Sequence, residues 1–178
     1  MFGEKGQSLL ELVVVIAVVV IVIGALTFAT IASLRNASFS QNQAQATKLA
    51  QEGIERVRIG RDRNQLIINL SNVTSWNGNT TGVGSIWDYP IYSSCETAGA
   101  CYFKITNSSG ALSYLISSTS FPTSGYEDPY GDSKFKRAII LSDNANIFRT
   151  QKTVTAIVQW SDFSGSHESR LTTILRKV

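Results

Sequence analysis

The pattern of apolar and polar positions begins with one long apolar run. Leu12 to Leu34 is a stretch of 23 residues without a charged side chain, rich in Val and Ile. At about 1.5 Å per residue a helix of this length measures ~34 Å, and a bilayer hydrocarbon core is about 30 Å thick. The run therefore predicts a membrane-spanning helix. Glu11 lies at its start, and an ionisable residue in such a segment is a functional hypothesis by default.

The helical pattern continues after the apolar run and becomes one-sided. No proline occurs between Arg35 and Arg63. Apolar or small residues recur there at steps of three and four, which indicates one buried helix face: Ala46, Leu49, Ala50, Gly53, Ile54 and Val57. Glu52 and Arg56 form an i,i+4 pair on the solvent side. Because glycine weakens a helix interior, Gly53 on the packing face predicts close approach of another backbone.

Alternating patterns in the second half predict strands. Residues 69–100 indicate loop with short strands at most. Residues 101–106 and 111–116 flank a turn at 107–110, and 162–167 can turn a second hairpin between 154–160 and 171–175. Phe135, Arg137, Ile139 and Leu141 alternate along another strand. Short turns without intervening helices favour an antiparallel sheet that is polar on one face and covered by the long helix on the other.

The fold class predicted is therefore α+β, with a long N-terminal helix packed on an antiparallel sheet. The expected divisions are a leader at 1–6, an apolar helical half at 7–34, an amphipathic half at 35–64 and a β-rich domain at 65–178.

The first six residues indicate where proteolytic cleavage is expected. A secretory signal peptide places its small residue after the apolar stretch, but here Gly6 precedes it. Glu4-Lys5-Gly6, the Leu9-Leu10-Glu11-Leu12 step and the Val/Ile run resemble the prepilin cleavage and methylation signal of type IV pilins and type II secretion pseudopilins. The resemblance covers residues 3–34. It implies a pilin-like fold, cleavage by prepilin peptidase after Gly6, N-methylation at Gln7, and Glu11 as the fifth mature residue. Pilins usually carry an apolar residue where this chain has Gln7.

Residues 49–58 are similar to minor-pilin-like proteins of the type IV pilus modification group. This similarity and Gln7 both favour a minor pilin or pseudopilin. The resemblance implies three kinds of partner: prepilin peptidase, other pilin or pseudopilin subunits, and inner-membrane assembly machinery. It also implies a single-pass membrane protein with its C-terminal domain outside the cytoplasm, placed in a pilus or pseudopilus after assembly. The alternative is an ordinary membrane anchor that holds a non-polymerising extracytoplasmic β-domain with a binding role. Such an anchor has no use for cleavage at Gly6.

Glu11 has a physical role in the first hypothesis. A carboxylate among apolar helices must find a cation or become protonated, because an unpaired buried charge is very costly. The nearest cation that a neighbouring subunit offers is its freed amine at Gln7. A pair made only between subunits would set their axial register.

Composition limits the partners, disulfides and cofactors that we expect. The net charge is +3 and the basic residues are scattered, so we expect no nucleic-acid partner. Cys95 and Cys101 favour a short disulfide loop in an oxidising compartment, with two free buried thiols as the alternative. With one histidine in the chain, a zinc site lacks ligands, and we expect no cofactor.

Two weaker candidates concern catalysis and metal binding. His167 with Asp162 suggests a Ser-His-Asp triad, but His167 is expected in a turn and no serine has a nucleophile elbow, so we predict no enzyme. Glu127, Asp128 and Asp132 are weak calcium candidates without EF-hand spacing, and a solvated acidic loop is favoured. The surrounding segment, 117–132, is long enough to be a recognition surface.

Overall fold

The computed structural model describes residues 4–63, 67–69, 83–95, 99–106, 111–131 and 134–178, without the side chains of 4–8, 67–69, 83–84 and 94–95. The chain divides into two compact units, Met1–Asn42 (unit 1) and Gln43–Val178 (unit 2). The helix α1, Glu4–Asp62, is continuous over 59 residues and contributes to both units.

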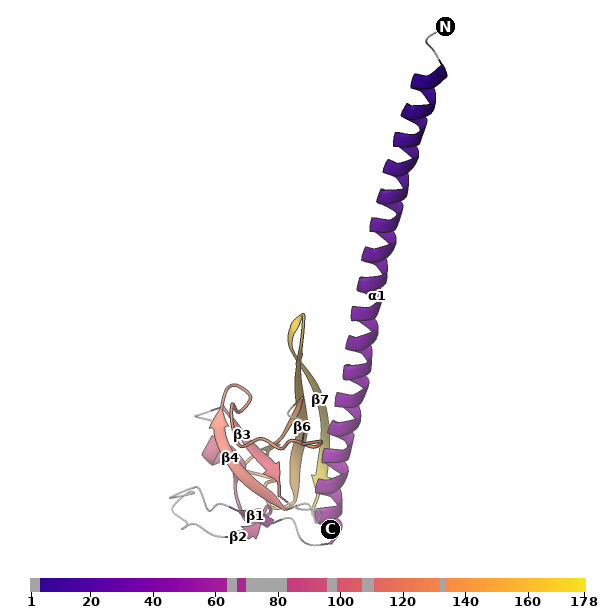
Figure 1. Ribbon diagram of the computed structural model, residues 1–178. Helices are drawn as coiled ribbons and strands as arrows, with labels where there is room; N and C mark the ends of the chain where they lie inside the picture. Colours follow the sequence, from indigo (N-terminus) through magenta and orange to yellow (C-terminus); the bar gives the residue numbers. More distant parts are fainter. Residues whose placement is uncertain (1–3, 64–66, 70–82, 96–98, 107–110, 132–133) are drawn as a thin grey trace. The chain divides into compact units, whose positions relative to one another are not determined.

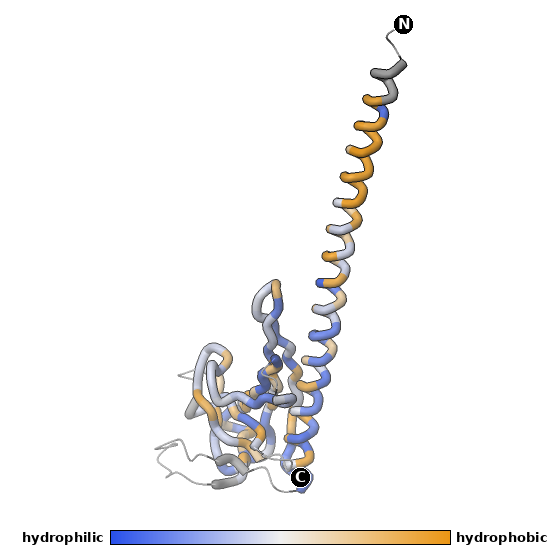
Figure 2. Tube along the Cα trace, in the orientation of Figure 1, coloured by the Kyte–Doolittle hydropathy of each residue, from blue (hydrophilic) through white to orange (hydrophobic). Residues whose placement is uncertain are grey.

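In unit 1, α1 is mostly apolar as far as Leu34 (Figure 2). Its side chains from Leu9 to Gln41 are exposed to solvent, and Asn42 is buried. By length and composition α1 is long and apolar enough to cross a membrane. The prediction that the helix continues past Leu34 is confirmed, and the helix ends at Asp62, two residues before the predicted boundary.

Within the described residues, unit 2 contains a seven-stranded sheet (Figure 1). The elements after α1 are β1 (Ile67–Asn69), β2 (Val83–Ser85), α2 (Ile91–Cys95), β3 (Ala100–Ile105), β4 (Leu112–Ser118), β5 (Phe135–Ser142), β6 (Gln151–Asp162) and β7 (Gly165–Arg176). Their order in the sheet is β2-β1-β4-β3-β5-β6-β7. The α+β prediction is confirmed, and β4-β3-β5-β6-β7 is the expected antiparallel sheet.

One pairing differs from the prediction, because β1 runs parallel to β4. β1 has three residues, too few to show an alternation from which its direction could be inferred. Both predicted hairpins are present as antiparallel pairs, although the turn at 107–110 lies outside the described residues.

The main core lies between the sheet and the part of α1 in unit 2. Ala46, Leu49, Ala50, Ile54 and Val57 are buried, as their spacing predicts. They belong to one cluster with the alternating residues of β5 and β6: Phe135, Ile139, Leu141, Val154, Ala156, Val158 and Trp160. Burial of a Leu- or Ile-sized side chain contributes about 1.5–3 kcal/mol, so this face of α1 is a main source of stability in unit 2.

The opposite face of the sheet is less polar than predicted. Tyr102, Ala138 and Ile157 form a second buried cluster, and Phe121 packs against it from the irregular segment after β4. The ring centroids of Tyr102 and Phe121 lie 6.1 Å apart, edge to face. The polar face was expected because β5 and β6 alternate, but a covering segment without periodicity cannot be recognised from the sequence.

Candidate functional site

The residues of the assembly hypothesis lie in unit 1. Gly6 and Gln7 belong to α1, but their side chains are outside the described residues. Glu11 is exposed on α1 and is followed by the apolar run. Within the described part of unit 1, this geometry leaves the carboxylate available for a partner outside the chain.

A network of four charged residues joins α1 to the sheet in unit 2. Arg137 is 0 % exposed on β5 and donates to Glu127 through Nε (2.9 Å) and Nη2 (2.6 Å). Its Nη1 donates to the carbonyl oxygen of Leu49 at 2.8 Å, and lies 3.7 Å from Glu52. Arg56 pairs with Glu52 at 2.6 Å and with Glu127 at 3.5 Å. The predicted Glu52–Arg56 pair is therefore present and belongs to a larger network.

Gly53 lies beside this network, and its neighbours differ from the prediction. A Cβ at Gly53 would lie 3.1 Å from Cδ of Arg137, 3.5 Å from the Cδ1 methyl of Ile139 and 3.6 Å from the Cβ of Ala156. The close neighbours are thus side chains of the sheet and not another backbone. The glycine makes room for the arginine that bonds to the helix.

The acidic segment is bound to these cations. Glu127 bonds to Arg137 and Arg56, and its backbone forms a bridge with Arg137. Asp128 Oδ1 accepts from the backbone N–H groups of Tyr130 and Gly131, which closes a turn. Asp132 lies outside the described residues. Among the described residues no three potential ligands gather as a metal site would need.

A second buried ion pair lies at the other end of β5. The side chains of Lys152 and Asp143 are both 0 % exposed and bond to each other, and Lys152 Nζ also donates to the carbonyl oxygen of Tyr89 at 2.7 Å. The Asp143 carboxylate accepts from the N–H groups of Ile91 (3.1 Å) and Tyr92 (2.7 Å). Burial lowers the pKa of Lys152, partly opposed by its bond to Asp143. The pair ties α2 to β5 and β6, a role that the sequence pattern did not reveal.

The prediction that His167 lies in a turn is wrong. His167 lies on β7, opposite Trp160. Its Nε2 lies 2.8 Å from Asp162 Oδ1, which also accepts from the Ser164 N–H at 2.7 Å. The Ser164 N–H bond, followed by the bond to His167, lowers the pKa of Asp162. This Asp–His pair closes a hairpin, so its geometry has a structural explanation.

Cys101 is buried on β3 and is not a free thiol. The side chain of Cys95, at the end of α2, lies outside the described residues. The pairing of Cys95 with Cys101 therefore stays a prediction.

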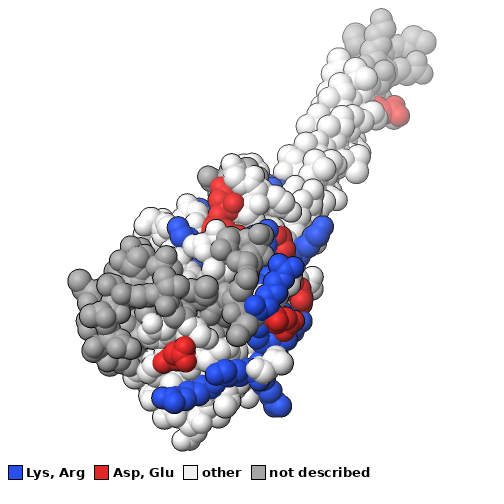
Figure 3. Space-filling model, turned by 90° about the horizontal axis from the view of Figure 1, so that it is seen from below, with Lys and Arg blue, Asp and Glu red and all other residues white. Residues whose placement is uncertain are grey.

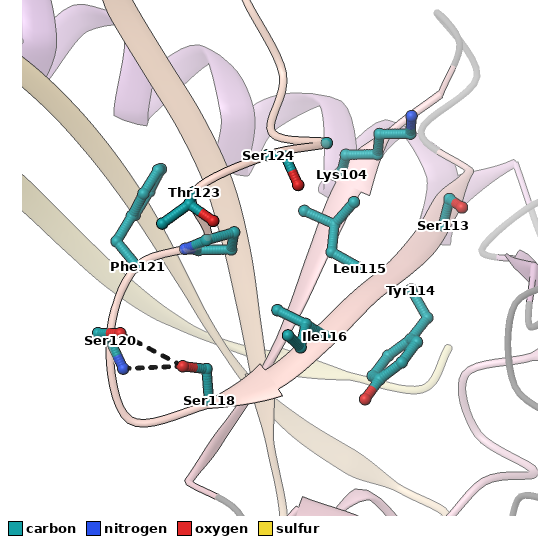
Figure 4. A pocket seen from close by; sticks show the side chains of 12 residues that line it. Lys104, Ser113, Tyr114, Leu115, Ile116, Ser118, Ser120, Phe121, Thr123 and Ser124 are labelled. Atoms are coloured by element: carbon teal, nitrogen blue, oxygen red, sulfur yellow. Dashed lines mark hydrogen bonds between the residues drawn. The ribbon is translucent and has the colours of Figure 1, made fainter.

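The segment predicted as a recognition surface borders a hollow of about 460 Å³ (Figure 4). Thr123 and Ser124 present hydroxyl groups on one side, opposite Leu115 and Ile116 of β4, and Lys104 lies at its rim. Ser118 and Ser120 shape the adjoining turn through a 3.1 Å bond from the Ser120 N–H. The hollow is rich in hydroxyl groups.

Exposed charges on unit 2 are mixed in sign. On the face drawn in Figure 3, lysine and arginine side chains lie beside acidic ones. Examples on α1 are Arg58 with Glu55 and Arg61 with Asp62, at 2.6 and 2.7 Å. Such exposed pairs contribute little stability.

Comparison with known proteins adds no relative. No protein-family model matches the chain, and neither the search of curated proteins nor the search of solved structures finds a match. The geometry and the sequence therefore carry the functional argument.

Proposed function

We propose that this chain is a pilin-like structural subunit, a minor pilin or pseudopilin that a prepilin peptidase cuts after Gly6. One observation carries the proposal: a single helix is exposed and apolar in unit 1 and packed into a sheet core in unit 2. The exposed part needs lipid or other apolar helices around it, since such a surface is unstable in water. Membrane storage followed by helix-to-helix assembly supplies both environments.

Glu11 and Gly6 distinguish this function from a simple anchor. A membrane anchor gains nothing from a carboxylate at the start of its apolar run, whereas a neighbouring subunit can pair it with the new amine of Gln7. The partners proposed are the peptidase, sister subunits and the inner-membrane assembly machinery. The C-terminal unit 2 then lies outside the cytoplasm.

The test is production of the full chain with and without a prepilin peptidase. Intact mass and N-terminal sequencing should show loss of residues 1–6 and a mature end at Gln7. Gly6→Val should block the cut, because it places a branched side chain at the cleaved bond, and Gly24→Val in the same helix is the control. Retention of Met1 in the presence of peptidase would overturn the prepilin assignment.

A second candidate is a non-polymerising anchored domain with a binding role. The hollow beside residues 118–125 favours it, because its hydroxyl groups and Lys104 could hold a polar ligand. Abundance in sheared surface filaments, compared with the membrane fraction, separates the two functions.

A further inference from the structure

One end of unit 2 carries exposed aromatic side chains beside lysines. Phe163, at the tip of the β6–β7 hairpin, is 98 % exposed, and Tyr130 is also exposed. Lys134 is exposed just before β5, and Lys136 follows it on that strand. We call Tyr130, Lys134, Lys136 and Phe163 the tip patch.

The hairpin tip is held in shape. β6 and β7 pair as far as Asp162 and Gly165, so only Phe163 and Ser164 form the turn. Gly165 has φ of 124°, a conformation that favours glycine, and Asp162 bonds across the turn to Ser164 and His167. Because the turn is already ordered, binding through the exposed ring of Phe163 would cost less conformational entropy.

The lysines border a hollow of about 280 Å³ on the outer side of the sheet. Gln159, Ser161 and Ser166 line the same hollow and add amide and hydroxyl groups to it. The ammonium groups of Lys134 and Lys136 lie over the rings of Phe135 (5.4 Å) and Tyr126 (4.9 Å), measured to the ring centroids. Two of the described carboxylates near this hollow have partners of their own: Asp162 Oδ1 lies 2.8 Å from His167 Nε2, and Glu168 lies 2.6 Å from Arg170. An anion such as a phosphate is the chemistry that this arrangement fits.

The tip patch lies at the end of unit 2 where the chain arrives from the apolar run. Along β7, Ser169 contacts Thr47 (3.2 Å) and Thr173 contacts Arg58 (3.0 Å), so β7 runs in the same direction as α1 within unit 2. The start of β7 therefore lies at the Gln43 end. Gln43 is nine residues beyond Leu34, a span of at most about 30 Å whatever the orientation of the two units.

We infer that the tip patch docks unit 2 on the surface of the membrane, with Phe163 in the interfacial layer and Lys134 and Lys136 on anionic phospholipid headgroups. Aromatic rings favour the membrane–water interface, and basic residues are attracted to anionic lipid. The inference rests on the membrane anchoring in the proposed function. It adds a stored state in which unit 2 lies on the bilayer before assembly.

The experiment uses the full chain in nanodiscs that hold one copy each, with a nitroxide on a cysteine placed at position 163. Val178, also 98 % exposed, lies just beyond the other end of β7 and is the matched control position. No described cysteine is a free thiol, so the added one takes the label. Collision with oxygen and with an aqueous nickel chelate reports whether each label is in lipid or in water.

With phosphatidylglycerol present, the label at 163 should be shielded from the nickel chelate while the label at 178 stays accessible. Lys134→Ser with Lys136→Ser should lower the docked-to-free ratio about fivefold for each lysine removed. Lys177→Ser, near position 178, should leave it unchanged.

Three outcomes would overturn the inference: equal accessibility at 163 and 178, equal shielding in pure phosphatidylcholine, or shielding only when several copies share a membrane. The last would assign the tip patch to another copy of the chain. Extraction of the chain by carbonate would refute the anchoring itself and the inference with it. An anchored chain with an accessible label at 163 refutes the docking alone.

Discussion

At the residue scale, Asp162 shows how one carboxylate organises the β6–β7 hairpin. Its Oδ1 accepts from the Ser164 N–H and contacts His167 Nε2. These bonds lower the pKa of Asp162 below its ordinary value of 3.8. The folded chain therefore favours the ionised form, and this stabilisation is present above the ordinary pKa and lost as the pH falls through the lowered one.

Asp162→Asn should consequently lower the melting temperature of unit 2 near neutral pH, and the difference in melting temperature from the wild type should close as the pH falls through the lowered pKa of Asp162. The asparagine still accepts a hydrogen bond but carries no charge to lose. Thermal unfolding of the full chain in detergent, followed by circular dichroism across this pH range, measures the gap. Asp62→Asn, at an exposed pair with Arg61, is the control. A gap that stays constant with pH would show that the charge of Asp162 does not stabilise the turn.

The cysteines give a second prediction at this scale. Exported protein should react with a thiol-alkylating reagent at Cys95 and Cys101 only after reduction, because Cys101 is buried and is not a free thiol. Loss of the bridge should loosen the loop between α2 and β3 and leave the sheet folded, since so short a loop stabilises by only about 2 kcal/mol. Mass spectrometry before and after reduction counts the modified thiols. Two reactive thiols in the exported, unreduced chain would contradict the bridge.

At the scale of elements, Arg137 holds together β5, α1 and the segment that carries Glu127. The arginine is 0 % exposed and Glu127 is 15 % exposed, so the two partners differ in their access to water. Removal of the Glu127 carboxylate leaves a fully buried guanidinium with Glu52 3.7 Å away, whereas removal of the guanidinium leaves a partly exposed carboxylate that still pairs with Arg56 at 3.5 Å.

Glu127→Ala should therefore destabilise unit 2 more than Arg137→Met. For a buried pair broken on one side the cost is about 3–5 kcal/mol, and partial exposure of Glu127 places the expected value at the lower end. Arg137→Met replaces the charge by an apolar chain of similar length. Glu55→Ala, which breaks the exposed pair with Arg58, should cost less than about 1 kcal/mol. Denaturant unfolding of the three variants orders them, and an Arg137→Met variant less stable than Glu127→Ala would contradict this account.

Gly53 belongs to the same contact between helix and sheet. Gly53→Val should destabilise unit 2 by about 1–3 kcal/mol, because its methyl groups would press on Arg137 and Ile139. Ser40→Val, outside unit 2 on the same helix, controls for the helix propensity of valine. Denaturant midpoints of the two variants give the comparison. Equal stability would mean that the sheet yields easily at Gly53.

Periodicity in the sequence was enough to predict α1, the five longer strands and the buried helix face. The periodicity placed Arg137 in the apolar series of β5, but it could not identify the residue that pairs with Arg137. Glu127 comes from an irregular segment that lies 71 residues from Arg56 along the chain. The sequence did not predict three further features for the same reason, since each depends on a tertiary contact without a repeating pattern. These are the pairing of Lys152 with Asp143, the parallel direction of β1 and the cover provided by Phe121.

At the scale of the whole molecule, the division into two units separates stability from assembly. The apolar clusters identified in unit 2 begin at Ala46, so its described core uses no residue of unit 1. Glu11, 35 residues earlier than Ala46, takes no part in that core. A change at Glu11 can therefore alter assembly without altering the fold of unit 2.

Glu11→Gln is the sharpest prediction from this separation. The variant should insert into the membrane as well as the wild type, because loss of a charge makes the segment more apolar. Its incorporation into filaments should fall steeply, since the amine at Gln7 of the neighbouring subunit loses its counter-charge. Loss of one side of such a pair costs about 3–5 kcal/mol where water is excluded.

Tagged wild-type and Glu11→Gln chains, compared at matched membrane levels, should differ in the amount of partner subunits recovered by pulldown. Glu55→Gln makes the same chemical change on the exposed surface of unit 2 and should be recovered like the wild type. Unchanged thermal unfolding of unit 2 in the Glu11 variant excludes a folding defect as the cause. Equal recovery of Glu11→Gln and wild type would refute pairing between subunits, even if cleavage after Gly6 occurs. A membrane anchor that does not assemble predicts equal recovery, whereas an assembling subunit predicts a large loss.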